Sequence, residues 1–179
     1  MEFQYDEAIA ILQRTPATLA ALLRGLPDSW TAPNEGADTW SPYDVVGHLL
    51  HGDQTDWIPR AHMILEQGES QPFESVNRTA MFEESRGKSL DDLLAAFEQA
   101  RAQSLANLAA LEITPEKLAR TGLHPRLGRV TLAQLLAAWV AHDLNHCGQV
   151  VEVMARQYAE AVGPWSAYLA ILTRPVLTE

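Results

Sequence analysis

The chain has 179 residues, of which 47% are hydrophobic and 20% are charged, a composition typical of a folded domain rather than of a disordered or fibrous protein. Its 13 basic and 23 acidic side chains give a formal net charge of −10. This charge disfavours a nucleic-acid partner, because the overall field would repel polyphosphate. The length predicts a single domain over residues 1–179 with one buried core.

Cysteine content and hydropathy bear on where the protein acts. The one cysteine, Cys147, has no partner for an internal disulfide. The first residues lack the basic and apolar segments of a secretory signal. The longest apolar stretch, near residues 132–141, is far shorter than the roughly 20 residues that span a bilayer. We therefore expect a cytoplasmic protein that has no membrane partner and acts on a small molecule.

The N-terminal part of the chain predicts one helix followed by a long loop. The helix is expected over residues 5–24, where apolar side chains recur at helical spacing, and Pro16 should bend or split it. Proline, glycine and asparagine cluster over residues 26–40, a composition that predicts a connecting loop.

A second helix is predicted from Ser41 to about Gln67. Ser41 is a typical capping residue, and the proline after it suits the first helical position. Pro59 lies inside the span and should kink the helix. Residues 68–88 are expected to be mostly loop, with a short helical turn near Met81.

The C-terminal half predicts two further long helices. One is expected over residues 90–112 and the other over residues 131–158, because both stretches begin with a capping sequence and continue as amphipathic patterns. Between them we expect a brief turn at residues 114–116 and a loop over residues 121–129. A short last helix is expected over residues 165–172.

The predicted fold class is all-α, because no stretch shows the sustained two-residue alternation of a strand. Each of the four principal helices has an apolar stripe that must be buried against another helix. A four-helix bundle is the architecture that achieves this.

Two histidines on the predicted last long helix point to a metal site. Because a four-residue step turns about 40° around an α-helix, His142 and His146 are expected on one face, a single turn apart. Such a pair can grip a metal ion with two nitrogens. Core histidines held by hydrogen bonds are the alternative interpretation of the pair on its own.

His48, on the second predicted helix, offers a third ligand. It shares its helical face with apolar Val45 and Leu49, so it is expected to point inward. Three imidazoles leave positions open on a divalent ion, as in reactive rather than structural metal centres. His51, one turn further on, is the rival for this place and otherwise has a supporting or solvent-facing role.

Four segments of the chain resemble a known family. The sequence WSPYDVVGHL over residues 40–49 resembles the second-helix signature of the DinB-like (DinB/YfiT) superfamily, and WVAHDLNHCGQ over residues 139–149 resembles its later helix with paired histidines. Residues 124–132 are similar to the loop and helix start that precede this pair, and residues 165–172 resemble the tail of one branch.

This resemblance implies a four-helix bundle that holds a divalent ion with His48, His142 and His146. The ion is often nickel or zinc, with iron or manganese as further candidates. Relatives include transferases that use a low-molecular-weight thiol, so the resemblance favours thiol chemistry. Similar bundles often dimerise, and the sequence leaves a homodimer open.

Several other polar residues have a simpler interpretation. Cys147 points about 100° away from the paired histidines and is expected to be a small core residue rather than a ligand or nucleophile. Asp44 is placed to cap its helix, and orientation of the His48 ring one turn further on is the alternative role. Asp143 and Asp53 are expected to face outward or to bind locally.

The loop before the last long helix carries further candidates. His124 is able to reach the mouth of the bundle, but the default for a loop histidine is the surface. Arg126 and Arg129 are candidates to hold an anionic substrate, with solvated charges as the alternative.

Two classes of function follow from these residues. In the first, the ion activates a thiol or a water molecule, as in a transferase or a hydrolase. In the second, the ion or the histidines only stabilise a non-catalytic bundle or bind a small ligand.

Overall fold

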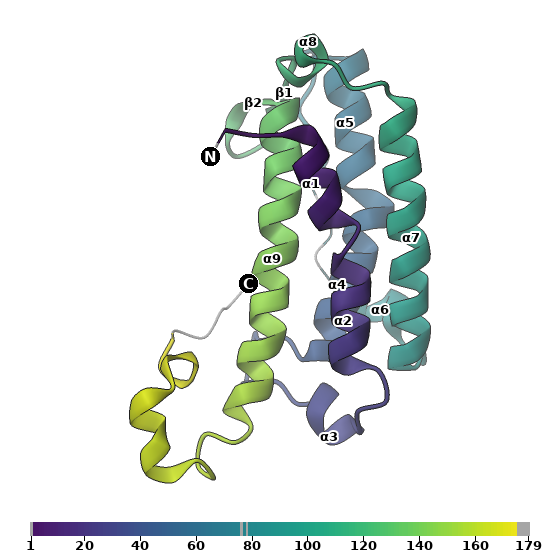
Figure 1. The fold of residues 1–179 in the computed structure, drawn as a ribbon. Coiled ribbons are helices and arrows are strands. Elements are labelled where there is room, and N and C mark those ends of the chain that lie inside the picture. Colours follow the sequence, from purple (N-terminus) through teal and green to yellow (C-terminus); the bar gives the residue numbers. More distant parts are fainter. Residues whose placement is uncertain (1, 76, 78, 175–179) are drawn as a thin grey trace.

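Four helical columns lie side by side in the computed structural model, which describes residues 2–75, 77 and 79–174 (Figure 1). The columns are α1 (Tyr5–Leu12) followed by α2 (Thr15–Leu23), α4 (Pro42–Thr55) followed by α5 (Trp57–Glu66), α7 (Leu90–Ala110), and α9 (Leu132–Arg156). The predicted four-helix bundle is therefore confirmed. Within the described residues, no helix is long and apolar enough to cross a bilayer.

Shorter elements connect and extend the columns. They are α3 (Asp28–Thr31), α6 (Ala80–Ser85), α8 (Pro115–Leu118), β1 (Thr121–His124), β2 (Gly128–Thr131), and the 3-10 helices η1 (Gly163–Tyr168) and η2 (Ala170–Leu172). The expected turns near Met81 and at residues 114–116 correspond to α6 and α8. The expected loop over 26–40 contains the single turn α3, and the short last helix takes the form of η1 and η2 beyond α9 (Figure 1).

Three of the long helices begin at a capping box, in which the first side chain and the side chain three residues later each bind the other's backbone N–H. The pairs are Ser41 with Asp44 for α4, Ser89 with Asp92 for α7, and Thr131 with Gln134 for α9. A capping box satisfies two backbone donors that the helix itself leaves unpaired. The starting points of α4 and α9, which carry the candidate metal ligands, are thereby defined locally.

The prolines that the sequence places inside its two first predicted helices, Pro16 and Pro59, lie in the first turns of shorter helices. Pro16 is in the first turn of α2, so the expected split of the first helix is confirmed. The prediction of a single helix from Ser41 to Gln67 with a kink at Pro59 is wrong. The chain breaks at Asp56, and Pro59 is the third residue of α5, where its missing N–H leaves no intrahelical hydrogen bond unmade.

The prediction of a plain loop over residues 121–129 is also wrong. β1 and β2 pair antiparallel there, with Thr121 opposite Thr131 and His124 opposite Gly128. Gly128 has a φ of +75°, a conformation that glycine adopts without strain at the end of a hairpin turn. Strands of four residues are too short to produce a recognisable alternation, so the pattern resembled a loop.

Buried apolar side chains form two clusters along the bundle. One contains Leu49 and Phe97, and the other contains Trp57 and Trp139. The guanidinium carbon of Arg101 lies 5.1 Å from the ring centre of Phe97 and 5.0 Å from that of Trp139. A charged side chain therefore occupies the place where the two clusters meet.

Close packing of the hairpin against α5 requires glycine at position 122. A Cβ atom on Gly122 would lie 2.8 Å from Cγ1 of Ile64 and 3.0 Å from Cε1 of Phe73. We predict that Gly122→Ala lowers the free energy of unfolding by about 1–3 kcal/mol, since side chains must shift to admit the methyl group. Urea denaturation measures this loss.

Gly148→Ala on α9 is the matched control. A Cβ atom there has no neighbour within 4 Å, and alanine is the better helix former by about 1 kcal/mol. This variant should be as stable as the original chain or more so. Equal stability of the two variants would contradict the packing argument at the hairpin.

Candidate metal centre

Three histidine rings from α4 and α9 meet inside the bundle. Nε2 of His142 lies 3.0 Å from Nε2 of His48 and 3.2 Å from Nε2 of His146. The potential ligand atoms of the three residues all lie within 4.8 Å of one another. His142 and His146 lie one turn apart on α9, and His48 lies on the neighbouring α4. This arrangement brings the predicted trio together.

The hydrogen-bond partner of His146 determines which of its nitrogens faces the other rings as an acceptor. Its Nδ1 lies 2.7 Å from Oε1 of Gln149. A carboxamide oxygen only accepts, so Nδ1 carries the hydrogen and the lone pair of Nε2 points toward His142. Burial and the neighbouring His142 lower the pKa of His146 to about 4. The ring is therefore neutral near pH 7, in the state that a metal ligand needs.

The donor set fits a divalent transition-metal ion. Bonds of 2.0–2.1 Å from imidazole nitrogens to one tetrahedral ion place those nitrogens about 3.3 Å apart, which is close to the distances of 3.0 and 3.2 Å between the Nε2 atoms. Imidazole suits zinc, nickel, copper and iron. The residues present are thus those that would hold such an ion.

Aromatic side chains flank the histidine cluster. The ring of Trp40 lies 4.6 Å from that of His48, centre to centre, and Trp57 meets His142 edge to face at 5.2 Å. Both tryptophans are buried. They restrict the rotation of the imidazoles and exclude water from part of their surroundings, which strengthens electrostatic interactions at the cluster.

The open side of the cluster faces a cavity of about 440 Å³, into which all three histidines project. The other lining residues are Asp56 at the break before α5, Trp57 and Arg60 of α5, Ser75, the hairpin residues His124, Pro125 and Arg126, and Asn145 of α9. A volume of this size accommodates a small organic molecule beside the histidines.

Residues 11–150 match the DinB superfamily. The chain belongs to the DinB superfamily. The matched range contains all three clustered histidines, so the family resemblance of the two histidine-containing segments is confirmed. A search among curated proteins found no match.

Two solved structures share the DinB-superfamily fold of this chain. YfiT from Bacillus subtilis, described as a probable metal-dependent hydrolase with an unusual four-helix bundle topology, is 22% identical, with a TM-score of 0.74 over 88% of this chain and 89% of that one. The four-helix bundle protein TT2238 is 23% identical, with a TM-score of 0.52 over 80% of this chain and 94% of that one.

His51, the rival third ligand, lies apart from the cluster of His48, His142 and His146. Its Nδ1 is 2.8 Å from Oε2 of Glu84, and the histidine side chain is buried while the glutamate is partly exposed. Glu84 belongs to α6, which packs against α4. His51 therefore joins α4 to α6 rather than contributing to the trio.

Cys147 and Asp44 have the structural roles expected of them. Cys147 is half-buried against the apolar cluster of Leu49 and Phe97, and burial raises the pKa of its thiol to about 11, which makes it a poor nucleophile. The carboxylate of Asp44 accepts a hydrogen bond from the backbone N–H of Ser41 at 2.9 Å. It caps α4 instead of orienting a histidine.

The hairpin candidates separate into two groups in the structure. His124 and Arg126 line the cavity above the histidine cluster. Arg129 instead pairs with Glu69 at 2.9 Å and does not line the cavity. Asp56, just before α5, and Arg60, within it, also line the cavity. The sequence did not single them out, although their spacing of four residues is that of an ion pair along a helix.

The expectation that Asp53 and Asp143 face outward is wrong. Asp53 is 4% exposed, Asp143 0% and Arg101 2%. Nε of Arg101 donates to Oδ2 of Asp53 at 2.8 Å, and its Nη1 donates to Oδ2 of Asp143 at 2.6 Å and to the carbonyl oxygen of Leu12 at 2.8 Å. Burial without partners would be prohibitive for these charges, and the mutual pairing is what permits it.

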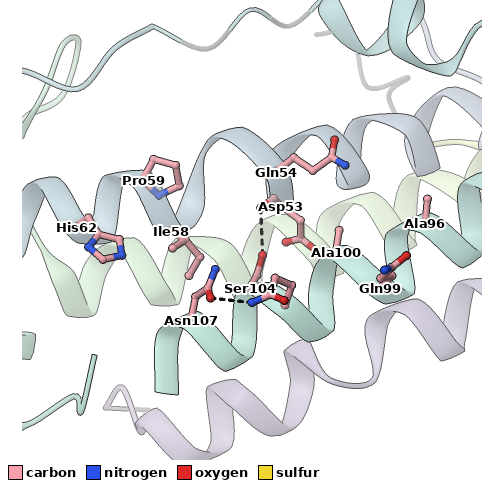
Figure 2. A pocket seen from close by; sticks show the side chains of 11 residues that line it. Asp53, Gln54, Ile58, Pro59, His62, Ala96, Gln99, Ala100, Ser104 and Asn107 are labelled. Atoms are coloured by element: carbon pink, nitrogen blue, oxygen red, sulfur yellow. Dashed lines mark hydrogen bonds between the residues drawn. The ribbon is translucent and has the colours of Figure 1, made fainter. Parts of the chain in front are cut away.

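This ion cluster of Arg101, Asp53 and Asp143 adjoins the candidate metal centre. The Oδ1 atom of Asp143 lies 3.9 Å from Nδ1 of its neighbour His142. On another side, Asp53 lies below a polar groove between α4–α5 and α7, where the hydroxyl of Ser104 donates to its carbonyl oxygen at 3.0 Å (Figure 2). The ion cluster thus connects the two helices that carry the histidines, α4 and α9, with α7.

We predict that Arg101→Met destabilises the chain by about 3–5 kcal/mol, since it leaves the buried Asp143 carboxylate without its cation and the buried Asp53 carboxyl group without its hydrogen-bond donor. Chemical denaturation at pH 7 measures the loss. Arg86→Met is the control, because the ion pair of Arg86 with Glu83 is exposed and surface pairs contribute little. An Arg101→Met variant as stable as the control would show that the buried cluster does not hold the columns together.

The ion cluster also predicts a pH dependence of stability. Burial raises the pKa of Asp53 to about 7, although Arg101 opposes the shift. A carboxyl group whose pKa is higher in the folded state retains its proton there longest, so its contribution to stability is lost as the pH rises. Relative to Asp53→Asn, we expect the original chain to lose about 2 kcal/mol between pH 5 and pH 8. If the free energies of unfolding of the two proteins change in parallel between pH 5 and pH 8, the raised pKa of Asp53 is contradicted.

Proposed function

We propose that this chain is a metal-dependent enzyme in which a divalent cation, nickel or zinc in the first place and iron or manganese otherwise, is held by His48, His142 and His146. The observation that carries the proposal is the meeting of three imidazole nitrogens within hydrogen-bonding distance on the wall of a cavity of about 440 Å³. A purely structural metal site has four protein ligands and no such opening.

A cation bound by three histidines would lower the pKa of a water molecule or thiol that binds it, which supplies a nucleophile at neutral pH. Two reactions use such a nucleophile: transfer of a low-molecular-weight thiol to an electrophile, and hydrolysis of an ester or amide. The family resemblance supports the first, and the description of YfiT as a probable metal-dependent hydrolase supports the second.

The chain's own residues supply the rest of the site. Among the described residues that line the cavity, Asp56 is the one carboxylate. Burial raises its pKa, whereas Arg60, 2.6 Å away, stabilises the charged form. We assign Asp56 the task of holding the proton that the nucleophile gives up. Trp57, the next residue along the chain, meets His142 edge to face and limits access of water to the reacting groups.

Elemental analysis of the purified protein tests the metal site. We expect about one divalent ion per chain and almost none in the double variant His142→Ala/His146→Ala, because a single remaining imidazole does not retain the ion against buffer. His51→Ala is the matched control, since this histidine pairs with Glu84 outside the cluster. Full occupancy in the double variant would rule out the proposed ligands.

Activity measurements distinguish an enzyme from a non-catalytic bundle. The metal-loaded chain and the double variant are compared in two assays: thiol addition to an aromatic electrophile, and hydrolysis of activated esters and amides. We expect one of the two reactions to require the metal and to disappear in the double variant. A chain that retains its ion and catalyses neither reaction would indicate a bundle in which the ion is structural.

A further inference from the structure

The cavity above the histidines contains a guanidinium group that the proposed function does not use. Arg126 lines the cavity from the turn between β1 and β2. Among the described residues, two further arginines near this site are neutralised, Arg60 by Asp56 at 2.6 Å and Arg129 by Glu69 at 2.9 Å. No acidic side chain among the described residues pairs with Arg126, so its charge is available to a ligand.

The turn that carries Arg126 is held in place by His124. Nδ1 of His124 accepts hydrogen bonds from the backbone N–H groups of Arg126 and Leu127, both at 3.1 Å. The strand behind it is anchored to the preceding connection, where the N–H of Phe73 donates to the carbonyl oxygen of Leu123 at 2.8 Å. Arg126 is therefore presented from a fixed turn and not from a free loop.

The same hydrogen bonds make His124 a donor on its other side. Because Nδ1 accepts, the hydrogen of the neutral ring is on Nε2. Burial and the positive charge of Arg60 lower the pKa of His124, and Arg126 adds to the effect. The rim of the cavity thus carries the charged guanidinium group of Arg126 and the N–H donor of His124. This combination is suited to binding an anion.

The balance of charge inside the cavity points the same way. Its described lining residues include two guanidinium groups and one carboxylate, which leaves a net positive charge, and a divalent cation on the histidines would add to it. This contrasts with a chain whose formal net charge is −10. A cavity whose lining has a net charge of one sign concentrates ligands of the opposite sign.

We infer that the small molecule bound in this cavity carries a carboxylate that pairs with Arg126 while its reactive end reaches the three histidines. The inference rests on the proposed function and specifies the substrate class of that site. A single uncompensated guanidinium matches a group with a single negative charge, which favours a carboxylate over a phosphate.

Thiols of known length serve as probes of this arrangement. The chain is loaded with Co²⁺, and a series of straight-chain mercaptocarboxylic acids is titrated beside the corresponding primary amides. Binding of the sulfur is followed by the absorption band that thiolate ligation gives to cobalt. At the best length we expect the acid to bind about tenfold more tightly than the amide, as one charge-assisted hydrogen-bonded pair would give.

Variants of the two hairpin arginines isolate the contribution of Arg126. In Arg126→Gln the acid and the amide should bind about equally tightly. In Arg126→Glu the amide should bind more tightly than the acid, because the like charge repels the carboxylate. Arg129→Gln is the matched control, since Arg129 pairs with Glu69 outside the cavity. It should retain the full preference for the acid.

The possible failures are distinguishable. If the acid binds no more tightly than the amide, or if its advantage is the same in the original chain and in Arg126→Gln, the inference is overturned while the metal site stands. Displacement of the mercapto acid by inorganic phosphate at lower concentrations than by acetate overturns the choice of a carboxylate. A chain that binds no cobalt contradicts the proposed function itself, and the inference that rests on it.

Discussion

One buried guanidinium group fixes the axial positions of the helical columns. Arg101 of α7 binds Asp53 of α4, Asp143 of α9 and the carbonyl oxygen of Leu12 at the end of α1, so it contacts all four columns of the bundle. Because a buried charge that loses its partner is strongly destabilising, the columns have little freedom to slide past one another. Apolar packing alone, which is less directional, would tolerate more axial variation.

The candidate metal centre depends on this axial register. His142 precedes Asp143 directly, and His48 lies five residues before Asp53 on the same helix. The two helices that supply the imidazoles are thus also the two that supply carboxylates to Arg101. A shift of one helical turn, about 5.4 Å, would separate Nε2 atoms that now lie 3.0 Å apart. The ion cluster and the histidines form one polar layer between the two apolar clusters of the core.

The sequence predicted those features that depend on local chemistry or on helical spacing. Capping serines indicated the starts of two long helices, and the four-residue step indicated that His142 and His146 share a face. The pairing of Arg101 with two aspartates was missed because it joins residues 48 and 42 positions apart, for which no local pattern exists. The one available signal was the place of Arg101 on the buried stripe of α7, between Phe97 and Leu108. The hairpin was not predicted, because its strands are only four residues long.

The division of the site between two kinds of element has a consequence for how such proteins diversify. The imidazoles are carried by long helices whose positions the core determines, whereas His124 and Arg126 stand on a tight turn of a two-stranded hairpin. Residues 125–127 of that turn are exposed, so substitutions there leave the buried clusters of the bundle in place. The hairpin part of the site is therefore able to vary in sequence without displacing the helices that carry the histidines.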